Sequence, residues 1–214
     1  MMPALLSRLA PMFGASSLTC AAARSAIVRG GKPKYADVCT FNSTGKPQAR
    51  LAMDHCRKGK FVGPLCPTST VPVAAILGQE HHCAGHEWVD FKGEAKKAGW
   101  TMTGAAAVSN KQAGASLAVR SIYHSGLTKG AREDCSPKES PGRLATGWID
   151  GVLKKGVLIL SVYLWHGEGL TARNQAILFA AGNVIKRHGG PWVLGGDFNT
   201  TPQELRLVMK EWLE

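Results

Sequence analysis

The sequence predicts a layered α/β or α+β domain. Segments typical of strands alternate along the chain with segments typical of helices, and the strongest strand segments are apolar nearly throughout, as expected of strands buried on both faces. The 214 residues are enough for one domain with a substantial core, and the sequence contains no internal repeat.

Two strands and a helix are predicted early in the chain. Residues 38–41 form a short β-type run that stops at Asn42, and residues 73–78 form a second, buried strand. The helix that follows ends at Gly99. Its apolar residues recur at helical spacing: Trp88, Phe91, Ala95 and Ala98.

The middle of the chain has weaker patterns. Residues 46–60 are basic and predicted to be partly helical, and residues 61–71 contain prolines typical of a loop. Two β-type stretches follow, around residues 100–107 and 115–119. Residues 124–147 are rich in Gly, Ser, Pro and charge, so we expect a long surface loop there.

The last part of the chain has the clearest elements. Residues 157–165 form the strongest strand, and an amphipathic helix then runs up to Gly189. A strand over residues 192–194 comes next. Residues 201–204, Thr-Pro-Gln-Glu, are a capping box with proline at the first helical position, which predicts a final helix.

The formal net charge of +11 favours a polyanionic partner. Residues 1–60 supply +8 of this charge, and residues 61–214 supply only +3. Much of the basicity therefore lies outside the segments that predict a core, and the total charge is weak evidence for binding to nucleic acid.

Residues 1–36 are predicted to be an N-terminal extension, and residues 37–214 the folded domain. The extension has no acidic residue, several Ala and Ser, and three arginines, which suits an organellar transit peptide. A disordered extension without a targeting role is the alternative. The transit-like composition favours an organellar location, and without such a role for the extension we expect an intracellular one. No apolar run approaches the length that crosses a bilayer.

Six cysteines fall at irregular spacings without a Cys-x-x-Cys pair, so no disulfide framework is predicted. The cluster of residues 81–83 (His-His-Cys) and His86 offers an alternative zinc site, completed by Cys56 or Cys66. Structural zinc sites usually have two spaced pairs of ligands, whereas this sequence has one crowded stretch.

Acid and amide side chains follow three apolar strands. Asn42 ends the first, Glu80 follows the second, and Asp197 and Asn199 follow the last. Sites in open α/β sheets form beyond the carboxyl ends of strands, so these side chains are expected to converge. Two carboxylates with neutral amides suit Mg²⁺ or Mn²⁺. Each residue also has an ordinary explanation, as a turn residue, a solvated carboxylate or the start of a loop.

Five segments carry a resemblance to a known family: VCTFNSTG, AAILGQEHH, GASLAVRS, VLILSVYLWHGEG and WVLGGDFNTTP. Their order and spacing, over roughly residues 36–204, resemble the endonuclease/exonuclease/phosphatase superfamily. The resemblance is to the metal-dependent branch that includes abasic-site endonucleases and the endonuclease domains of non-LTR retrotransposons. It implies a four-layered sandwich, with two facing β-sheets flanked by helices, and hydrolysis of a phosphoester by an activated water with Mg²⁺ or Mn²⁺.

The resemblance also implies roles for the residues that match the family's motifs. Glu80 is expected to bind the metal and Asn42 to lie beside it. Asp197 is expected to position the attacking water. Tyr163 is expected to contact the scissile phosphate, and Asn199 to bind and stabilise it.

One further residue is a weaker candidate, and one feature departs from the family. His166 stands near a position where the family often has a polar residue after the tyrosine, and it is a weaker candidate. The family also has a further Asp and a Ser-x-His-like motif beyond Gly-Asp-Phe-Asn, whereas only twelve residues follow Pro202 here, none of them histidine. We therefore expect an incomplete second sheet, a domain lacking its C-terminal portion, and little or no nuclease activity from the chain alone.

Two functions remain open, and whether the chain is an enzyme depends on which is correct. The first is a metal-dependent phosphodiester hydrolase, endonuclease-like, with nucleic acid as the leading substrate class and small phosphoesters or lipids as alternatives. The second is a non-catalytic mobile-element remnant or a nucleic-acid-binding module that uses the basic residues 24–60.

Overall fold

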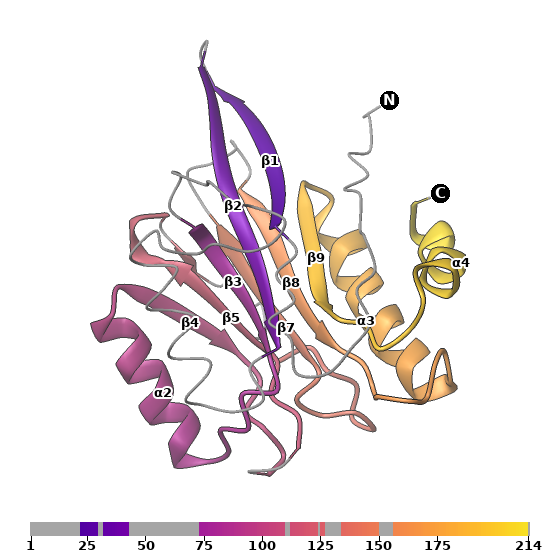
Figure 1. Ribbon diagram of the computed structural model, residues 1–214. Helices are drawn as coiled ribbons and strands as arrows, with labels where there is room; N and C mark the ends of the chain where they lie inside the picture. Colours follow the sequence, from indigo (N-terminus) through magenta and orange to yellow (C-terminus); the bar gives the residue numbers. More distant parts are fainter. Residues whose placement is uncertain are drawn as a thin grey trace.

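A computed structural model describes residues 22–29, 32–42, 73–109, 112–123, 125–126, 134–149 and 156–213. Two β-sheets lie face to face; helix α2 (His86–Lys97) covers the outer face of one sheet and helix α3 (Ala172–His188) that of the other (Figure 1). Helix α4 (Pro202–Leu213) contacts α3. These layers confirm the predicted sandwich of two facing sheets flanked by helices.

The first sheet has five strands in the order β1-β2-β3-β5-β4. Their bounds are Ala22–Arg29 (β1), Lys32–Asn42 (β2), Val73–Gln79 (β3), Trp100–Gly104 (β4) and Ser116–Arg120 (β5). Strands β2 and β3 run parallel, with Asn42 opposite Gln79, while the other neighbours are antiparallel. The carboxyl ends of β2 and β3 therefore share one edge of the sheet.

The second sheet has four strands in the order β6-β7-β8-β9. Their bounds are Ser125–Gly126 (β6), Leu144–Ile149 (β7), Val157–Tyr163 (β8) and Trp192–Asp197 (β9). Strands β8 and β9 run parallel, with Tyr163 opposite Asp197. This sheet thus repeats the arrangement of the first, with two parallel strands that finish together.

Three apolar clusters hold the layers together, because side chains alternate between the two faces of each strand. Between the sheets, Val38, Ala75, Leu77 and Val119 pack against Ile149, Val157 and Ile159. On the outer faces, Trp88 and Phe91 of α2 pack on the first sheet, and Ile177, Leu178 and Ala181 of α3 pack on the second. Each fully buried Val, Leu, Ile or Phe side chain stabilises the fold by about 1.5–3 kcal/mol.

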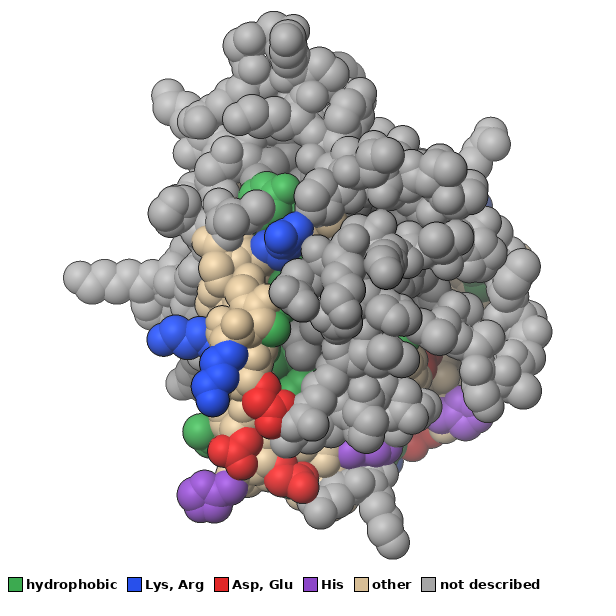
Figure 2. Space-filling model, turned by 60° about the vertical axis from the view of Figure 1, so that its left-hand side comes forward, with side chains coloured by type: hydrophobic (Ala, Val, Ile, Leu, Met, Phe, Trp, Pro, Cys, Tyr) green, Lys and Arg blue, Asp and Glu red, His purple; other side chains and the backbone are tan. Residues whose placement is uncertain are grey.

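The outward side of α2 is charged. Figure 2 looks at this side of the molecule and shows basic and acidic side chains together with a histidine there. Glu87 lies in the first turn of the helix and Lys96 and Lys97 lie in the last, so these charges interact favourably with the helix dipole. No helix in the part of the chain that the structure describes is long and apolar enough to cross a membrane.

The helix ends confirm the predicted signals. Gly189 takes a left-handed conformation after α3, and its N–H donates to the Ile185 carbonyl at 3.2 Å. Before α4, the Glu204 N–H donates to Thr201 Oγ1 at 3.3 Å and the Thr201 N–H donates to Glu204 Oε2 at 3.0 Å, so the capping box forms in both directions.

One expectation is wrong in part. Residues 124–147 do not form a surface loop throughout, because Leu144–Ile149 is a buried strand in the middle of the second sheet. Arg143, just before that strand, is only 3% exposed. The predicted helix at 46–60 and loop at 61–71 lie outside the described residues. The structure also places strand β1 within the segment predicted as an extension, and the domain boundary at residue 37 stays a prediction.

Candidate active site

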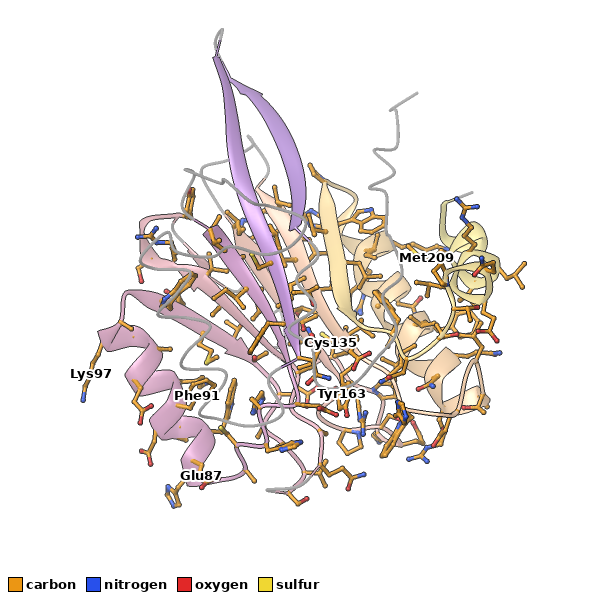
Figure 3. All side chains as sticks on the ribbon, viewed as in Figure 1. Glu87, Phe91, Lys97, Cys135, Tyr163 and Met209 are labelled. Carbon is orange, nitrogen blue, oxygen red and sulfur yellow. The ribbon has the colours of Figure 1, made fainter. Side chains whose placement is uncertain are left out.

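The strand-end residues meet at one edge of the sandwich. Strands β2 and β3 of the first sheet and strands β8 and β9 of the second all finish there. Figure 3 shows Tyr163 at this edge, below the two sheets and near the end of β2. The sequence therefore brings side chains from four separate strands to one place, as the parallel pairing requires.

Two hydrogen bonds connect the sheets at this edge. Asn42 Nδ2, from the first sheet, donates to Asp197 Oδ2 of the second at 2.8 Å. The Tyr163 hydroxyl, from the second sheet, donates to Glu80 Oε1 beyond the end of β3. These four candidate residues thus form two polar pairs side by side.

A buried polar cluster lies under the two pairs. Gln79 Nε2 donates to Ser161 Oγ at 2.9 Å, and Ser161 Oγ donates to the Gly78 carbonyl at 3.2 Å. Thr40 Oγ1 donates to Gln79 Oε1 at 3.2 Å. Gln79 and Ser161 are 1% and 0% exposed, so these bonds are shielded from water and fix the strand ends against each other.

The backbone at the site is unusual at three positions. Glu80 and Asn199 have φ angles of 56° and 44°, in the left-handed region that non-glycine residues rarely adopt. Gly196 has φ 156°, and a Cβ there would overlap the backbone oxygen of Val162. The room that this glycine leaves is therefore filled by the neighbouring strand.

Burial dominates the electrostatics of Asp197. It raises the pKa of this carboxyl above the ordinary aspartate value, while the hydrogen bonds from Asn42 and from the Asn199 N–H oppose the shift. The negative charge of Glu80 raises the pKa of Asp197 further. Burial and the bond to Glu80 also raise the pKa of the Tyr163 phenol, so this group stays a proton donor at neutral pH.

Arg143 packs against Tyr163, and the sequence did not predict this contact. Its guanidinium carbon lies 4.2 Å from the ring centroid of Tyr163 and 3.7 Å from that of Trp165. Its Nη1 donates to the carbonyls of Tyr163 and Leu164 at 3.5 and 3.3 Å. Arg173 lies 3.9 Å from the Trp165 centroid, and it must occupy the other face of that ring, since two guanidinium groups cannot share one face at such distances.

Asn199 and His166 complete the site. Asn199 Nδ2 donates to the Leu164 carbonyl at 2.9 Å, and Asn199 Oδ1 lies 3.1 Å from His166 Nδ1. The Asn199 N–H donates to Asp197 Oδ1 at 3.3 Å. The structure thus brings together all six residues that the sequence singled out: Asn42, Glu80, Tyr163, His166, Asp197 and Asn199.

No protein-family model and no curated protein sequence matches the chain. Solved structures do match it. An endonuclease/exonuclease/phosphatase family protein from Bacteroides thetaiotaomicron is 16% identical with a TM-score of 0.52, over 81% of this chain and 68% of that protein. The chain has the endonuclease/exonuclease/phosphatase fold. The resemblance deduced from the strand-end motifs is thereby confirmed at the level of the fold.

Two further structures share the endonuclease/exonuclease/phosphatase fold with this chain. The human Nocturnin catalytic domain, with a bound sulfate anion, is 15% identical with a TM-score of 0.50, over 81% of this chain and 66% of that domain. ANGEL2, a 2',3'-cyclic phosphatase, is 11% identical with a TM-score of 0.51, over 77% of this chain and 53% of that protein. The chain therefore spans between about half and about two thirds of the proteins it resembles.

The oxygen donors at this edge of the endonuclease/exonuclease/phosphatase fold fit a hard divalent cation. Mg²⁺ is typically held by one or two carboxylates, keeps several waters and takes oxygens from a phosphate substrate. Glu80 and Asp197 repel each other electrostatically, and a cation between like charges relieves that repulsion. Among the described residues, no three His, Cys, Asp or Glu side chains gather as a complete set of ligands.

The zinc alternative fits poorly. His81 is buried, and both of its ring nitrogens are in use: Nε2 lies 3.1 Å from the Ala105 carbonyl, and Nδ1 accepts from the Cys83 N–H at 3.1 Å. The ring stacks on Trp88 with a centroid distance of 4.6 Å. His81 is therefore a packed core residue, and Cys56 and Cys66 lie outside the described residues.

Proposed function

We propose that the chain is a divalent-metal-dependent phosphodiester hydrolase domain, endonuclease-like in its chemistry. The observation that supports this most is the pairing of Asn42 with Asp197 and of Tyr163 with Glu80 at the carboxyl edge of both sheets. Carboxylates, neutral amides and a phenol in one place can bind a metal and a phosphate without adding excess negative charge. The fold, which hydrolytic proteins share, supports the same proposal.

Each residue has a task in the proposed reaction. Asp197 accepts a proton from the attacking water, and a buried carboxyl with a raised pKa is suited to this because a general base works best when its pKa approaches the working pH. The amide of Asn199 and the phenol of Tyr163 bind the phosphate oxygens. Glu80, with Asn42 beside it, holds Mg²⁺ or Mn²⁺, which when bound neutralises charge on the phosphate.

Nucleic acid is the substrate class that we propose. A phosphodiester flanked by further phosphates offers more contacts than a small ester. ANGEL2 carries the same fold and is a 2',3'-cyclic phosphatase, which supports a phosphoester of nucleotide origin. Small phosphoesters and phospholipids are the competing substrates in the test.

Purified chain incubated with Mg²⁺ and a labelled oligonucleotide tests the proposal. We expect cleavage that EDTA abolishes and that Asp197→Ala or Glu80→Gln lowers by about 10²-fold or more. Glu87→Gln, on the exposed side of α2, is the matched control and should keep wild-type activity. Cleavage that survives Asp197→Ala would contradict the proposal.

The same samples also distinguish the proposed hydrolase from a non-catalytic binding module and from hydrolases of other substrates. A non-catalytic nucleic-acid-binding module would retain DNA in a salt-dependent way that EDTA does not change, without cleavage. Parallel incubations with a small phosphodiester and with phospholipid vesicles report the substrate class. The same rate decides between the proposed activity and the expectation of little or no activity: cleavage that depends on Asp197 would show that expectation to be wrong.

A further inference from the structure

The hydrogen bonds of Asn199 fix the tautomer of His166. The Leu164 carbonyl can only accept, so the side-chain atom of Asn199 that contacts it is the amide nitrogen. The atom of Asn199 that faces His166 Nδ1 at 3.1 Å is then the amide oxygen, which is itself only an acceptor. Nδ1 of His166 therefore carries the hydrogen.

This tautomer leaves Nε2 as the reactive nitrogen of His166. Nε2 takes no part in the bond to Asn199, and the side chain is exposed. In the neutral ring Nε2 is a proton acceptor, and in the protonated ring it is a donor. A histidine held at one nitrogen by an orienting group, with the other nitrogen available, is the arrangement that general acid–base catalysis uses.

The turn that carries His166 is held rigidly. Asn174 of α3 is fully buried, and its Oδ1 accepts from the Trp165 N–H at 2.7 Å. Asn174 Nδ2 donates to the carbonyls of Trp165 and Gly169 at 3.1 and 2.7 Å. Trp165 itself lies between the guanidinium groups of Arg143 and Arg173. The backbone on both sides of His166 is thus fixed before any substrate binds, which favours a catalytic position.

His166 also lies close to the proposed proton acceptor. Asn199 contacts His166 through its side chain and Asp197 through its backbone N–H, at 3.1 and 3.3 Å. His166 and Asp197 therefore flank one residue, Asn199, which we assign to the phosphate. An in-line displacement requires a base at the attacking oxygen and a proton donor at the departing oxygen, and both groups here lie next to the residue that we assign to the phosphate.

We propose that His166 Nε2 donates the proton that the leaving oxygen takes up during phosphodiester cleavage. In this step the oxygen of water bonds to phosphorus and the bond from phosphorus to the ester oxygen breaks. The water proton passes to Asp197, and the proton on His166 Nε2 passes to the departing oxygen. Solvent then restores both groups. The inference rests on the proposed function and deepens it, since it assigns the second proton transfer of the same site.

Two substrates with different leaving groups test the assignment. Nitrophenolate is a good leaving group that needs no proton, whereas the alkoxide released from a dinucleotide needs one. His166→Asn keeps a donor at the place of Nδ1, and so keeps the bond to Asn199, but it removes Nε2. We expect it to lower kcat for the dinucleotide by about 10²-fold or more and kcat for a nucleoside nitrophenyl phosphodiester by less than about tenfold.

The outcomes separate the inference from the proposed function. Equal losses on both substrates, or no loss on either, would overturn the role of His166 while cleavage that depends on Asp197 upholds the proposed function. Cleavage of neither substrate by the wild-type chain would overturn both. His86→Asn, an exposed histidine at the start of α2, is the control and should leave both rates unchanged.

A spectroscopic measurement tests the geometry without any turnover. In ¹⁵N NMR spectra of the full chain, the ring whose signals disappear in His166→Asn should carry its proton on Nδ1 whenever that ring is in its neutral form. Asn199→Ala should remove this preference, because the acceptor for Nδ1 is lost. A neutral wild-type ring with its hydrogen on Nε2 and none on Nδ1 would overturn the inference.

Discussion

Acid should destabilise this protein chiefly through one buried histidine. His81 is 1% exposed, stacks on Trp88, and uses both ring nitrogens in the neutral form. Protonation would place a second hydrogen on Nδ1, against the Cys83 N–H, and would bury a charge. Burial therefore lowers the pKa of His81 from 6.5 to about 4.

The sign and size of the effect follow from linkage. The pKa of this histidine is lower in the folded chain than in the unfolded chain, so the unfolded chain binds the proton more tightly, and stability falls as pH drops from 6.5 towards 4. Between about pH 7.5 and about pH 4.5 the loss from His81 alone is about 2.5 kcal/mol. This is a large share of the stability of an ordinary domain, which is about 5–15 kcal/mol.

Urea unfolding of the wild type and of His81→Gln at both pH values measures this loss. Glutamine carries one donor and one acceptor, as the neutral ring does, but it does not titrate. The difference between the unfolding free energies of the two proteins should change by about 2.5 kcal/mol between the two pH values, since contributions from all other groups cancel. If the difference in unfolding free energy changes by less than about 0.5 kcal/mol between the two pH values, the reasoning is refuted. His86→Gln serves as the control.

Three further predictions concern residues of the site, each measured by urea unfolding. Arg143→Lys keeps the charge but loses the planar stacking on Tyr163 and Trp165, so it should lower the free energy of unfolding by about 2 kcal/mol; a loss below about 0.5 kcal/mol would contradict this. Gly196→Ala should cost about 2 kcal/mol or more, because its Cβ would overlap a backbone oxygen of β8; an unchanged midpoint would refute this. Burial raises the pKa of Asp197, so the wild type loses stability as pH rises from the ordinary aspartate pKa through the raised one. The stability of Asp197→Ala relative to the wild type should therefore increase between about pH 3.5 and about pH 7.5, and a constant difference would exclude that shift.

The elements that the sequence predicts well are those whose signal is local. The apolar run that became β8 is buried at every position, and the capping box before α4 needs only four consecutive residues. Strand β7 escaped prediction because its segment, Leu-Ala-Thr-Gly-Trp-Ile, contains a glycine and lies next to a stretch rich in turn residues. That glycine, Gly147, leaves room for Leu117 of the facing sheet, since a Cβ there would overlap the end of the Leu117 side chain. The residue that allows the two sheets to approach is thus the one that makes the strand resemble a loop.

The strand-end residues of the site could be predicted from the sequence, whereas the buried residues that hold them in place could not. Asn42, Glu80 and Asp197 could be grouped because parallel strands deliver their last residues to one edge. Ser161 gave no signal, because its partner Gln79 is 82 positions away in the sequence and the contact exists only after the sheets pack. Arg143 gave none either, since a basic residue in a polar segment is normally solvated, and here tertiary packing overrides that tendency.

The geometry of the site depends on how the two sheets pack against each other. Both hydrogen-bonded pairs of the site join residues of the first sheet to residues of the second, so the spacing between the sheets sets the distance between the proposed metal-binding and catalytic side chains. That spacing depends on small residues far from the polar edge, including Ala75 and Gly147. A larger side chain at either position would move Asp197 away from Asn42 without touching the site, and a shift of about 1 Å is enough to lower a rate by about 10²-fold. The geometry of the proposed site therefore depends on its smallest core residues as well as on its acids and amides.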